Sequence, residues 1–267
     1  MNSKTKGASF AALFSVASVW FGSHAGGGFA TGNQTTQYYV QYGWFAPIMA
    51  VIAMAILALV IRECVLMYRN HSFTNYKDMF VEMWAPYSKL EILFEIYMIL
   101  IVFVGTAVSI SGAATLFTQF GAPYGVSLVI IGVILFLCTI FGAGLVSKAS
   151  TLMSIIILIC SFSIFIVGIV NKSDVISNIF ATHQIEGVTN NLPGAFWKAI
   201  VYAGYQSVCS PSLCACSGVL KKRKDASKAM FLAFLMNGIA LALSATMLLG
   251  WYKDFMAADA LALPTLY

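Results

Sequence analysis

Charged side chains are scarce in this chain. Only 9% of its 267 residues are Asp, Glu, Lys or Arg, whereas about 25% are charged in a typical soluble domain. Hydrophobic residues make up 60% of the sequence, and the mean hydropathy is +0.86. This balance excludes an ordinary soluble domain and predicts a protein whose helices lie in lipid.

Signatures of catalysis are also missing. The sequence contains no Ser/His/Asp constellation, no HExxH pattern, no phosphate-binding loop and no paired carboxylates, so we do not expect an enzyme. The net charge of +5 does not require an anionic partner, because membrane proteins carry an excess of Lys and Arg in their cytoplasmic loops. Nucleic acid is therefore not an expected partner. The cysteines occur mainly in apolar segments, which indicates free thiols rather than a disulfide framework. They are Cys64, Cys138, Cys160, Cys209, Cys214 and Cys216.

Long charge-free runs define the expected architecture. A membrane-spanning helix needs about 20 mainly apolar residues, and the first run, 7–61, is too long for a cleaved signal and continues into further spans. Gly43, Gly121–Pro123 and Gly142–Gly144 divide the runs, because Gly and Pro end helices. We therefore predict an all-α membrane protein in which residues 1–267 form one transmembrane domain. Seven spans are expected, at 8–39, 43–67, 90–119, 123–142, 149–170, 194–219 and 228–251.

Basic residues orient these spans. With a cytoplasmic N-terminus, only Lys172, Lys198 and Lys253 fall outside, as the excess of Lys and Arg in cytoplasmic loops requires. The loop 70–89 and the outer loop 171–193 each carry apolar residues that predict a short interfacial helix. An aromatic belt of Trp44, Trp197 and Trp251 is expected near the outer interface. The basic residues expected inside are Lys4, Lys6, Arg62, Arg69, Lys77, Lys89, Lys148, Lys221, Lys222, Arg223, Lys224 and Lys228.

Glycines gather in the middle of the first span. Residues 20–34 contain the triplet Gly26–Gly28 beside the polar Ser23, His24 and Thr31. Because a glycine in a helix interior costs about 1 kcal/mol relative to alanine, the triplet favours an unwound stretch whose backbone groups face protein, water or ligand. Broken helices of this kind form transporter sites. The alternative is that these glycines only let another helix pack closely.

The sixth span is interrupted in a similar way. Residues 203–212 combine Gly204, Ser207, Ser210 and Pro211, and a proline disfavours helix at the residue before it. Interruptions at corresponding places in two halves point to a solute site, and a separation of five spans means that the two halves run in opposite directions. The alternative is an ordinary proline kink in a packed helix.

The string from Gly26 to Gln34, Gly-Gly-Gly-Phe-Ala-Thr-Gly-Asn-Gln, resembles the first-helix signature of the YkvI family of bacterial membrane proteins. That family is placed in the amino acid, polyamine and organocation transporter superfamily. Its pattern is similar to Gly-Ala-Gly-Phe-Ala-Ser/Thr-Gly followed by a polar residue and Glu. Gly27 and Gln34 depart from this pattern, so an acid that would bind a coupling cation in relatives is an amide here.

The resemblance implies a LeuT-like fold of ten helices in two inverted five-helix repeats. Residues 8–170 would form the first repeat and residues 194–267 an incomplete second one. We therefore expect the chain to be truncated, with the segment after Trp251 leading toward an eighth helix. The fold implies alternating access coupled to Na⁺ or H⁺, and no other cofactor.

The expected function is a secondary transporter, or symporter, in the plasma (inner) membrane. Its expected partners are the lipid bilayer and a small solute, an amino acid or a related zwitterion or amine, with Tyr205 and Phe29 as gating side chains. His24 is the one histidine in a predicted span, and it either handles a proton or solute or is satisfied by a backbone carbonyl. The sequence indicates no oligomeric state. The predicted solute-binding residues are Ser23, His24, Gly26, Gly27, Gly28, Phe29, Thr31, Thr106, Ser109, Tyr205, Gln206, Ser207 and Ser210.

Other functions remain open at this point. A channel-like or purely structural membrane protein has the same composition. A soft-metal transporter would use Cys209, Cys214 and Cys216. However, Cys214 and Cys216 are two residues apart and so point to different faces of a helix. We therefore predict no metal site. The run Lys221–Lys224 either fixes topology or also binds anionic lipid headgroups.

Overall fold

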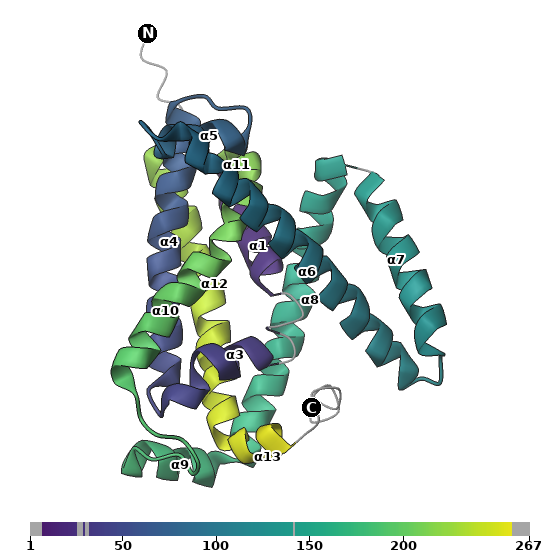
Figure 1. Ribbon diagram of the computed structural model, residues 1–267, viewed down its shortest axis with the longest axis vertical. Helices are drawn as coiled ribbons and strands as arrows, with labels where there is room; N and C mark the ends of the chain where they lie inside the picture. The colour runs from purple at the N-terminus through teal and green to yellow at the C-terminus, as the bar shows by residue number, and fades with distance from the viewer. Residues whose placement is uncertain (1–6, 26–28, 30–31, 141, 258–267) are drawn as a thin grey trace.

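The computed structural model describes residues 7–25, 29, 32–140 and 142–257, which fold into helices joined by short loops (Figure 1). Short 3₁₀ segments accompany the α-helices: η1 (Val40–Tyr42), η2 (Ser88–Leu90), η3 (Ser207–Cys209) and η4 (Ser217–Val219). The α-helices are α1 (Phe10–His24), α3 (Asn33–Tyr38), α4 (Ala46–Asn70), α5 (Tyr76–Met83), α6 (Glu91–Thr118), α7 (Tyr124–Ile140), α8 (Gly142–Asn171), α9 (Ser173–Thr182), α10 (Leu192–Gln206), α11 (Ser210–Cys216), α12 (Arg223–Gly250) and α13 (Tyr252–Ala257).

Four segments of the described chain are helical, long and apolar enough to cross a membrane. They are Ala46–Asn70, Ser88–Thr118, Thr151–Asn171 and Arg223–Gly250. The helices Phe10–His24 and Tyr124–Ile140 are apolar but shorter than a full span. The all-helical architecture predicted from the sequence is therefore present, while the count of seven spans and the LeuT-like arrangement stay predictions.

Several local features follow the sequence closely. The predicted corner between the third and fourth spans is present, because α6 ends at Thr118, α7 begins at Tyr124, and Gly121 has a φ of +85°. A positive φ favours glycine because it has no Cβ. Both expected loop helices form, as α5 and α9. The first and sixth expected spans are each divided into shorter helical pieces.

Two helices begin earlier than the sequence predicts. Helix α8 starts at Gly142 instead of 149. The residues expected to form a loop before the fifth span therefore form the first turns of this helix. Helix α12 starts at Arg223 instead of 228, inside the basic run. There the Asp225 carboxylate accepts hydrogen bonds from the backbone N–H groups of Lys221 (3.1 Å) and Lys222 (3.0 Å). Such capping satisfies backbone donors that otherwise have no partner, and it allows a charged segment to start a helix.

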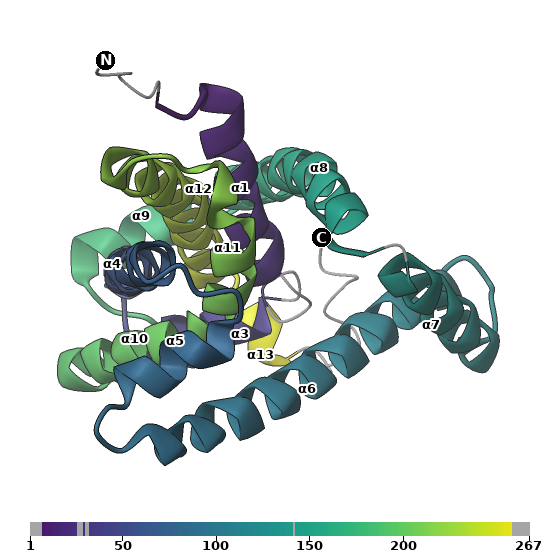
Figure 2. The same cartoon turned by 90° about the horizontal axis from the view of Figure 1, so that it is seen from above.

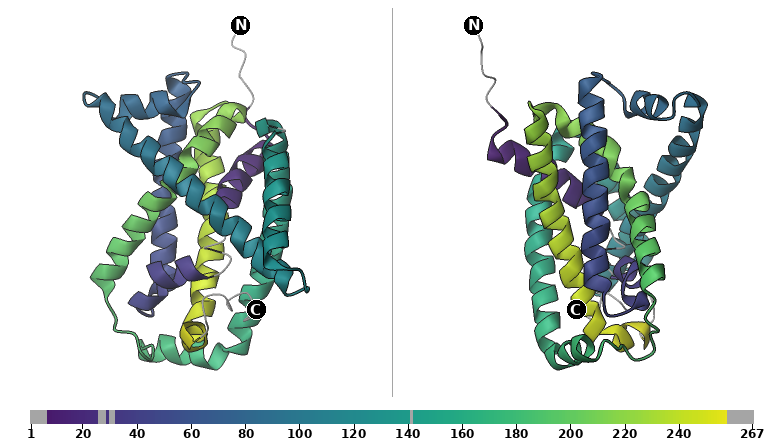
Figure 3. Two further views of the ribbon diagram at one scale, coloured as in Figure 1. Left: turned by 45° about the vertical axis from the view of Figure 1, so that its right-hand side comes forward. Right: turned by 90° about the vertical axis from the view of Figure 1, so that its left-hand side faces the viewer.

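Helix α12 lies at the centre of the fold. It packs most extensively against α4, and it also contacts α1 and α8. Figure 3 shows α4, α12 and α8 as neighbouring, roughly parallel rods. Small residues permit this close packing, since they let helix backbones approach one another. The fully buried alanines of this interface region are Ala46, Ala50 and Ala53 of α4 and Ala226, Ala229, Ala233, Ala240 and Ala245 of α12.

Helices α6 and α7 form a hairpin that extends away from this central group (Figure 2). The first turns of α6 are attached to the rest of the chain, because Phe94 stacks on Phe80 of α5 with ring centroids 3.6 Å apart. Further along, α6 presents mostly exposed apolar side chains, such as Val102, Phe103 and Val104. An apolar helix of this kind is suited to contact with lipid tails.

Three tryptophans, Trp44, Trp197 and Trp251, lie near the ends of helices at one end of the molecule. Helices α4 and α10 begin, and α12 ends, at the end of the molecule that carries α9 and α13 (Figure 1). Trp44 stacks on His183 with ring centroids 4.2 Å apart, and Trp251 donates its indole N–H to the Gly168 carbonyl at 2.9 Å. Trp197 is exposed. The three side chains thus occupy one end of the bundle, as an interfacial belt requires.

The contact between α8 and α12 gives a test of this packing. A Cβ added to Gly168 would lie 2.5 Å from the buried Met247 Sδ, whereas a Cβ at Gly132 of α7 meets nothing within 4 Å. We expect Gly168→Leu to lower the free energy of unfolding by about 1–3 kcal/mol through overpacking. Gly132→Leu is the matched control and should leave the melting temperature unchanged or slightly raised. Thermal unfolding in detergent measures both, and an equal response of the two variants would contradict the packing.

Candidate functional site

The two interrupted segments lie side by side. Helix α1 ends at His24, and α3 begins after Gly32, whose φ is +72°. The second segment passes from α10 through the 3₁₀ turn η3 into α11. Helix α1 contacts both η3 and α11, while α3 contacts α10. The glycine triplet Gly26–Gly28 and Thr31 lie outside the described residues.

A chain of buried polar side chains crosses between these segments. His24 Nε2 lies 2.8 Å from the Tyr202 hydroxyl, and the Gln206 amide donates to the same hydroxyl at 3.2 Å. All three side chains are buried. A phenol oxygen can accept two hydrogen bonds, so the Tyr202 hydroxyl either donates to His24 Nε2 or accepts from it, according to the histidine tautomer.

Asn237 of α12 lies next to the other ring nitrogen of His24. Its side-chain amide donates to the Ala233 carbonyl at 2.8 Å, which leaves Oδ1 as an acceptor. The Asn237 and His24 side chains are hydrogen-bonding partners, although Asn237 Oδ1 and His24 Nδ1 do not meet strict hydrogen-bond geometry. Buried polar atoms are nearly always paired, so a polar ligand would have to insert between these two side chains.

Tyrosine rings surround this polar chain. The rings of Tyr38, the last residue of α3, and of Tyr39, which follows it, lie 4.9 Å and 5.3 Å from the Tyr202 ring, centroid to centroid. The Tyr205 ring is stacked on Tyr38, and its hydroxyl accepts from the Gln34 amide at 3.1 Å. The half-buried position of Tyr205 puts it at the edge of the cluster. Together these rings hold α3 against α10.

Phe29 connects the polar chain to a small cavity. Its ring lies 5.6 Å from the His24 ring and 5.9 Å from Phe165 of α8. It also lines a cavity of about 210 Å³, smaller than the roughly 300–1,000 Å³ of pockets for drug-sized ligands. The other lining residues are Gly32, Ile157, Cys160, Ser161, Ile164, Phe165 and Ser244.

The structure brings some of the predicted residues together. His24, Phe29, Tyr205 and Gln206 join the cluster, and Ser207 lies in η3 next to it. Their placement follows from the two interruptions, which bring the end of α1 against the end of α10.

Other predicted residues lie elsewhere. Ser23 is exposed, and its hydroxyl donates to the Val19 carbonyl of its own helix. Ser210 is buried beside Cys64 of α4. Thr106 and Ser109 are exposed on α6, and Ser109 donates to the Gly105 carbonyl. Spacing along a helix gives no register between helices, so the sequence had no means of orienting α6.

Residues outside the predicted set complete the cluster. Tyr202 lies four residues before Gln206, on the same face of α10, and this spacing was a usable signal. Asn237 is a lone amide within an apolar helix, where polar side chains are costly and so mark functional positions. Tyr38 and Tyr39 were not predicted as site residues, because their segment reads as the end of one long span over 8–39.

The hydrogen-bonded chain makes a definite prediction about stability. Tyr202→Phe removes the hydroxyl shared by His24 and Gln206, and leaves both of them buried with an unpaired atom. The free energy of unfolding should fall by about 1–3 kcal/mol. Tyr87→Phe is the control, because Tyr87 is 72% exposed. Thermal unfolding in detergent compares the two variants.

A double-mutant cycle tests whether the contact itself carries this effect. His24→Leu and Tyr202→Phe should together cost less than the sum of their separate effects, with a coupling of about 0.5–3 kcal/mol. Additive effects would mean that the bond between the two side chains contributes nothing to stability.

A scan against protein-family models, a search of curated proteins and a search of solved structures each find no match to this chain. The resemblance of its glycine-rich string to the YkvI family therefore stays a prediction. The case for a function rests on the geometry of the two interrupted segments.

Proposed function

We propose that this chain is a secondary transporter of a small zwitterionic or amine solute, with an amino acid as the expected cargo. One observation carries the proposal: two apolar segments depart from regular α-helix, one ending at His24 and one tightening into the 3₁₀ turn η3, and buried polar side chains connect them where they adjoin. Irregular backbone within an apolar helical bundle is tolerated where it is covered by protein or lines a cavity. Interrupted helices of this kind supply solute sites in transporters.

The polar side chains suit a zwitterion. In the tautomer with the proton on Nδ1, His24 offers a donor to a carboxylate, and Asn237 Oδ1 is an acceptor for an ammonium group, for a solute that inserts between the two side chains. Hydrogen bonds to charged groups are about twice as strong as neutral ones, so a few such contacts suffice for binding.

Movement of Phe29 would connect the polar chain with the cavity between α8 and α12, because Phe29 touches His24 and also lines that cavity. The stacked Tyr38 and Tyr205 rings would act at the other edge of the cluster. Alternating access would then expose the site to one side of the membrane at a time. In this proposal the chain has the LeuT-like helix order, with its N-terminus in the cytoplasm and the α9 end outside.

Coupling to an ion is part of the proposal. Gln34 occupies the position at which the resembling family has Glu, and its amide holds Tyr205. Without a carboxylate there, we propose either Na⁺ or H⁺ as the coupling ion. A thermal shift with solute that requires low pH would identify H⁺, and one that requires sodium would identify Na⁺.

Two other functions make different predictions. A channel or structural subunit would not accumulate a solute against its gradient. A soft-metal carrier needs converging ligands, and within the part of the chain that the structure describes no group of three or more His, Cys, Asp or Glu could hold a metal ion. Cys214 lies beside Met79, while Cys209 lies beside Gln206. The transporter proposal is therefore the one favoured by an observed arrangement.

A ligand screen by thermal shift tests the proposal. The purified protein is heated with amino acids and small amines in sodium, potassium or low-pH buffer. A solute at a hundredfold excess over its dissociation constant stabilises the folded state by about 2.7 kcal/mol. Asn237→Leu and Gly27→Leu should each lose about tenfold or more in affinity for the solute, because 1.4 kcal/mol corresponds to tenfold. The matched control is Asn178→Leu, at an exposed position on α9.

Uptake into proteoliposomes separates transport from binding alone. The solute found in the screen should accumulate above its outside concentration when an ion gradient is imposed, and not without the gradient. Equilibration without accumulation would identify a channel. A folded protein that responds to no solute in either assay would contradict the proposal.

The orientation has a separate test. In a variant whose cysteines are replaced, Glu186→Cys should react with a membrane-impermeant maleimide on intact cells, because it lies in the proposed outer loop. Lys89→Cys should react only after lysis. Both positions are exposed, so access to the reagent is decided by the membrane. The reverse pattern of labelling would overturn the proposed topology.

A further inference from the structure

A long groove follows the outer side of α4 beside the first turns of α12. It consists of two adjoining hollows, of about 690 Å³ and about 300 Å³, which share Leu59. Glu63 and Arg223 line the larger hollow. Ala55, Ala58, Arg62, Ser227 and Phe231 line the smaller.

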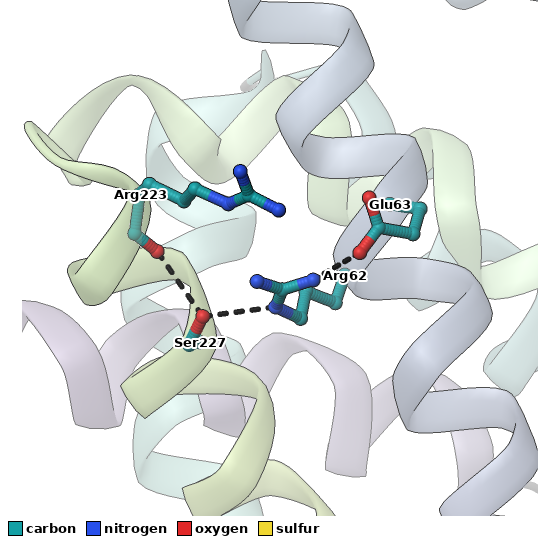
Figure 4. Close-up of polar contacts among 4 residues, drawn as sticks. All are labelled: Arg62, Glu63, Arg223 and Ser227. Atoms are coloured by element: carbon teal, nitrogen blue, oxygen red, sulfur yellow. Dashed lines mark hydrogen bonds and ion pairs between the residues drawn. The ribbon is translucent and has the colours of Figure 1, made fainter.

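Two arginines stand where the hollows meet. Arg62 donates from Nε to the Ser227 hydroxyl at 2.9 Å, and Ser227 donates to the Arg223 carbonyl at 3.2 Å. Figure 4 shows both guanidinium groups in the space between α4 and α12. Arg62 is also paired with Glu63. The Arg223 guanidinium forms no ion pair with any residue of the described chain, so the pair of arginines retains a net positive charge after Glu63 is counted.

More positive charge lies close by. Lys222, Lys224 and Lys228 are exposed on the same end of α12. The nearby carboxylate of Asp225 is already occupied, because it accepts backbone N–H groups from Ala8, Lys221 and Lys222. The groove entrance therefore attracts an anion. A planar guanidinium binds phosphate through two parallel hydrogen bonds, which makes arginine well suited to this role.

Below the arginines the groove is apolar and open. Ala55 and Ala58 leave space along α4, and Phe231 of α12 forms the opposite wall. Leu59 is 65% exposed and Phe231 is 61% exposed, so apolar carbon faces the surroundings here. From Arg62 to Ala55 the groove follows about 10 Å of helix at 1.5 Å per residue. That length matches the upper part of one acyl chain.

We propose that this groove binds one anionic phospholipid, with its phosphate between Arg62 and Arg223 and an acyl chain along Ala58 and Phe231. Two adjoining features favour a phospholipid in this groove. An anion site opens directly into an apolar groove between two helices that are long enough to span a membrane. A free anion would contact the arginines but leave the apolar groove unfilled. A soluble peptide would not reach a face buried in lipid. The inference depends on α4 and α12 crossing the membrane, and not on transport.

Native mass spectrometry of the purified full chain tests the site. Phosphatidylglycerol and phosphatidylcholine with identical acyl chains are titrated separately in detergent. Wild type should bind phosphatidylglycerol at least about tenfold more tightly. Arg62→Gln combined with Arg223→Gln should remove that preference, since each basic residue near a lipid surface contributes about fivefold and bidentate contacts add more. Arg62→Lys combined with Arg223→Lys should retain part of the preference.

Lys89→Gln is the matched control, because Lys89 is exposed near the same end of the molecule but does not line the groove. It should weaken binding by no more than about fivefold. Ala58→Phe fills the groove and should weaken both lipids at least about tenfold. Unfolding temperatures show whether each variant is folded.

Three outcomes would overturn the proposal. Equal binding of the two lipids by wild type would remove the role of charge. Equal losses in Lys89→Gln and the arginine variant would mean nonspecific attraction. Inorganic phosphate that stabilises the lipid-free protein as strongly as phosphatidylglycerol does would identify a site for a free anion instead of a lipid.

Discussion

Two apolar segments depart from regular α-helix inside the bundle, and the rest of the structure depends on how their polar groups are covered. The first ends at His24, and the second tightens into the 3₁₀ turn η3 before it continues as α11. In an apolar surrounding, an unpaired backbone or side-chain polar group costs several kcal/mol. Helix α1 ends at His24 and α10 ends at Gln206, so both ends must be enclosed by protein. Their contact meets this requirement, because His24, Tyr202 and Gln206 share hydrogen bonds instead of facing lipid. The same constraint concentrates polar chemistry at one place.

Close helix packing makes that enclosure achievable. The contacts of α12 with α4, α1 and α8 place it at the centre, and buried alanines on α4 and α12 keep the backbones near one another. Bulky side chains then fill the space around the interruptions: Trp20, Tyr39 and Tyr202 are all fully buried. Helices α6 and α7 show the contrast, because they run without interruption and lie mostly exposed. Hydroxyl groups of α6 are satisfied within the helix itself, as Ser109 is on the Gly105 carbonyl. An uninterrupted helix pairs its own backbone groups and needs no such cover.

The sequence predicted features that are decided locally. Gly121 with its positive φ, the loop helices α5 and α9, and the breaks in the first and sixth apolar segments all follow from residues within a few positions. Features decided by distant contacts were missed. The early start of α12 depends on the Asp225 caps, and the exposed positions of Thr106 and Ser109 depend on how α6 is rotated. Asn237 became part of the site only when α12 was placed against α1.

The first turns of α12 connect the two sites by geometry. Asp225 accepts the backbone N–H of Ala8 at 3.0 Å, just before α1 begins, and it also caps α12 through Lys221 and Lys222. Arg223 in the same turn lines the groove beside α4. Further along α12, Asn237 lies next to His24 near the end of α1. Because α12 is one continuous helix from Arg223 to Gly250, a displacement of its start relative to α4 must also strain the Ala8 contact or carry α1 with it. Any opening of the polar cluster at this end therefore either breaks the Ala8 to Asp225 hydrogen bond or moves α1 and α12 together.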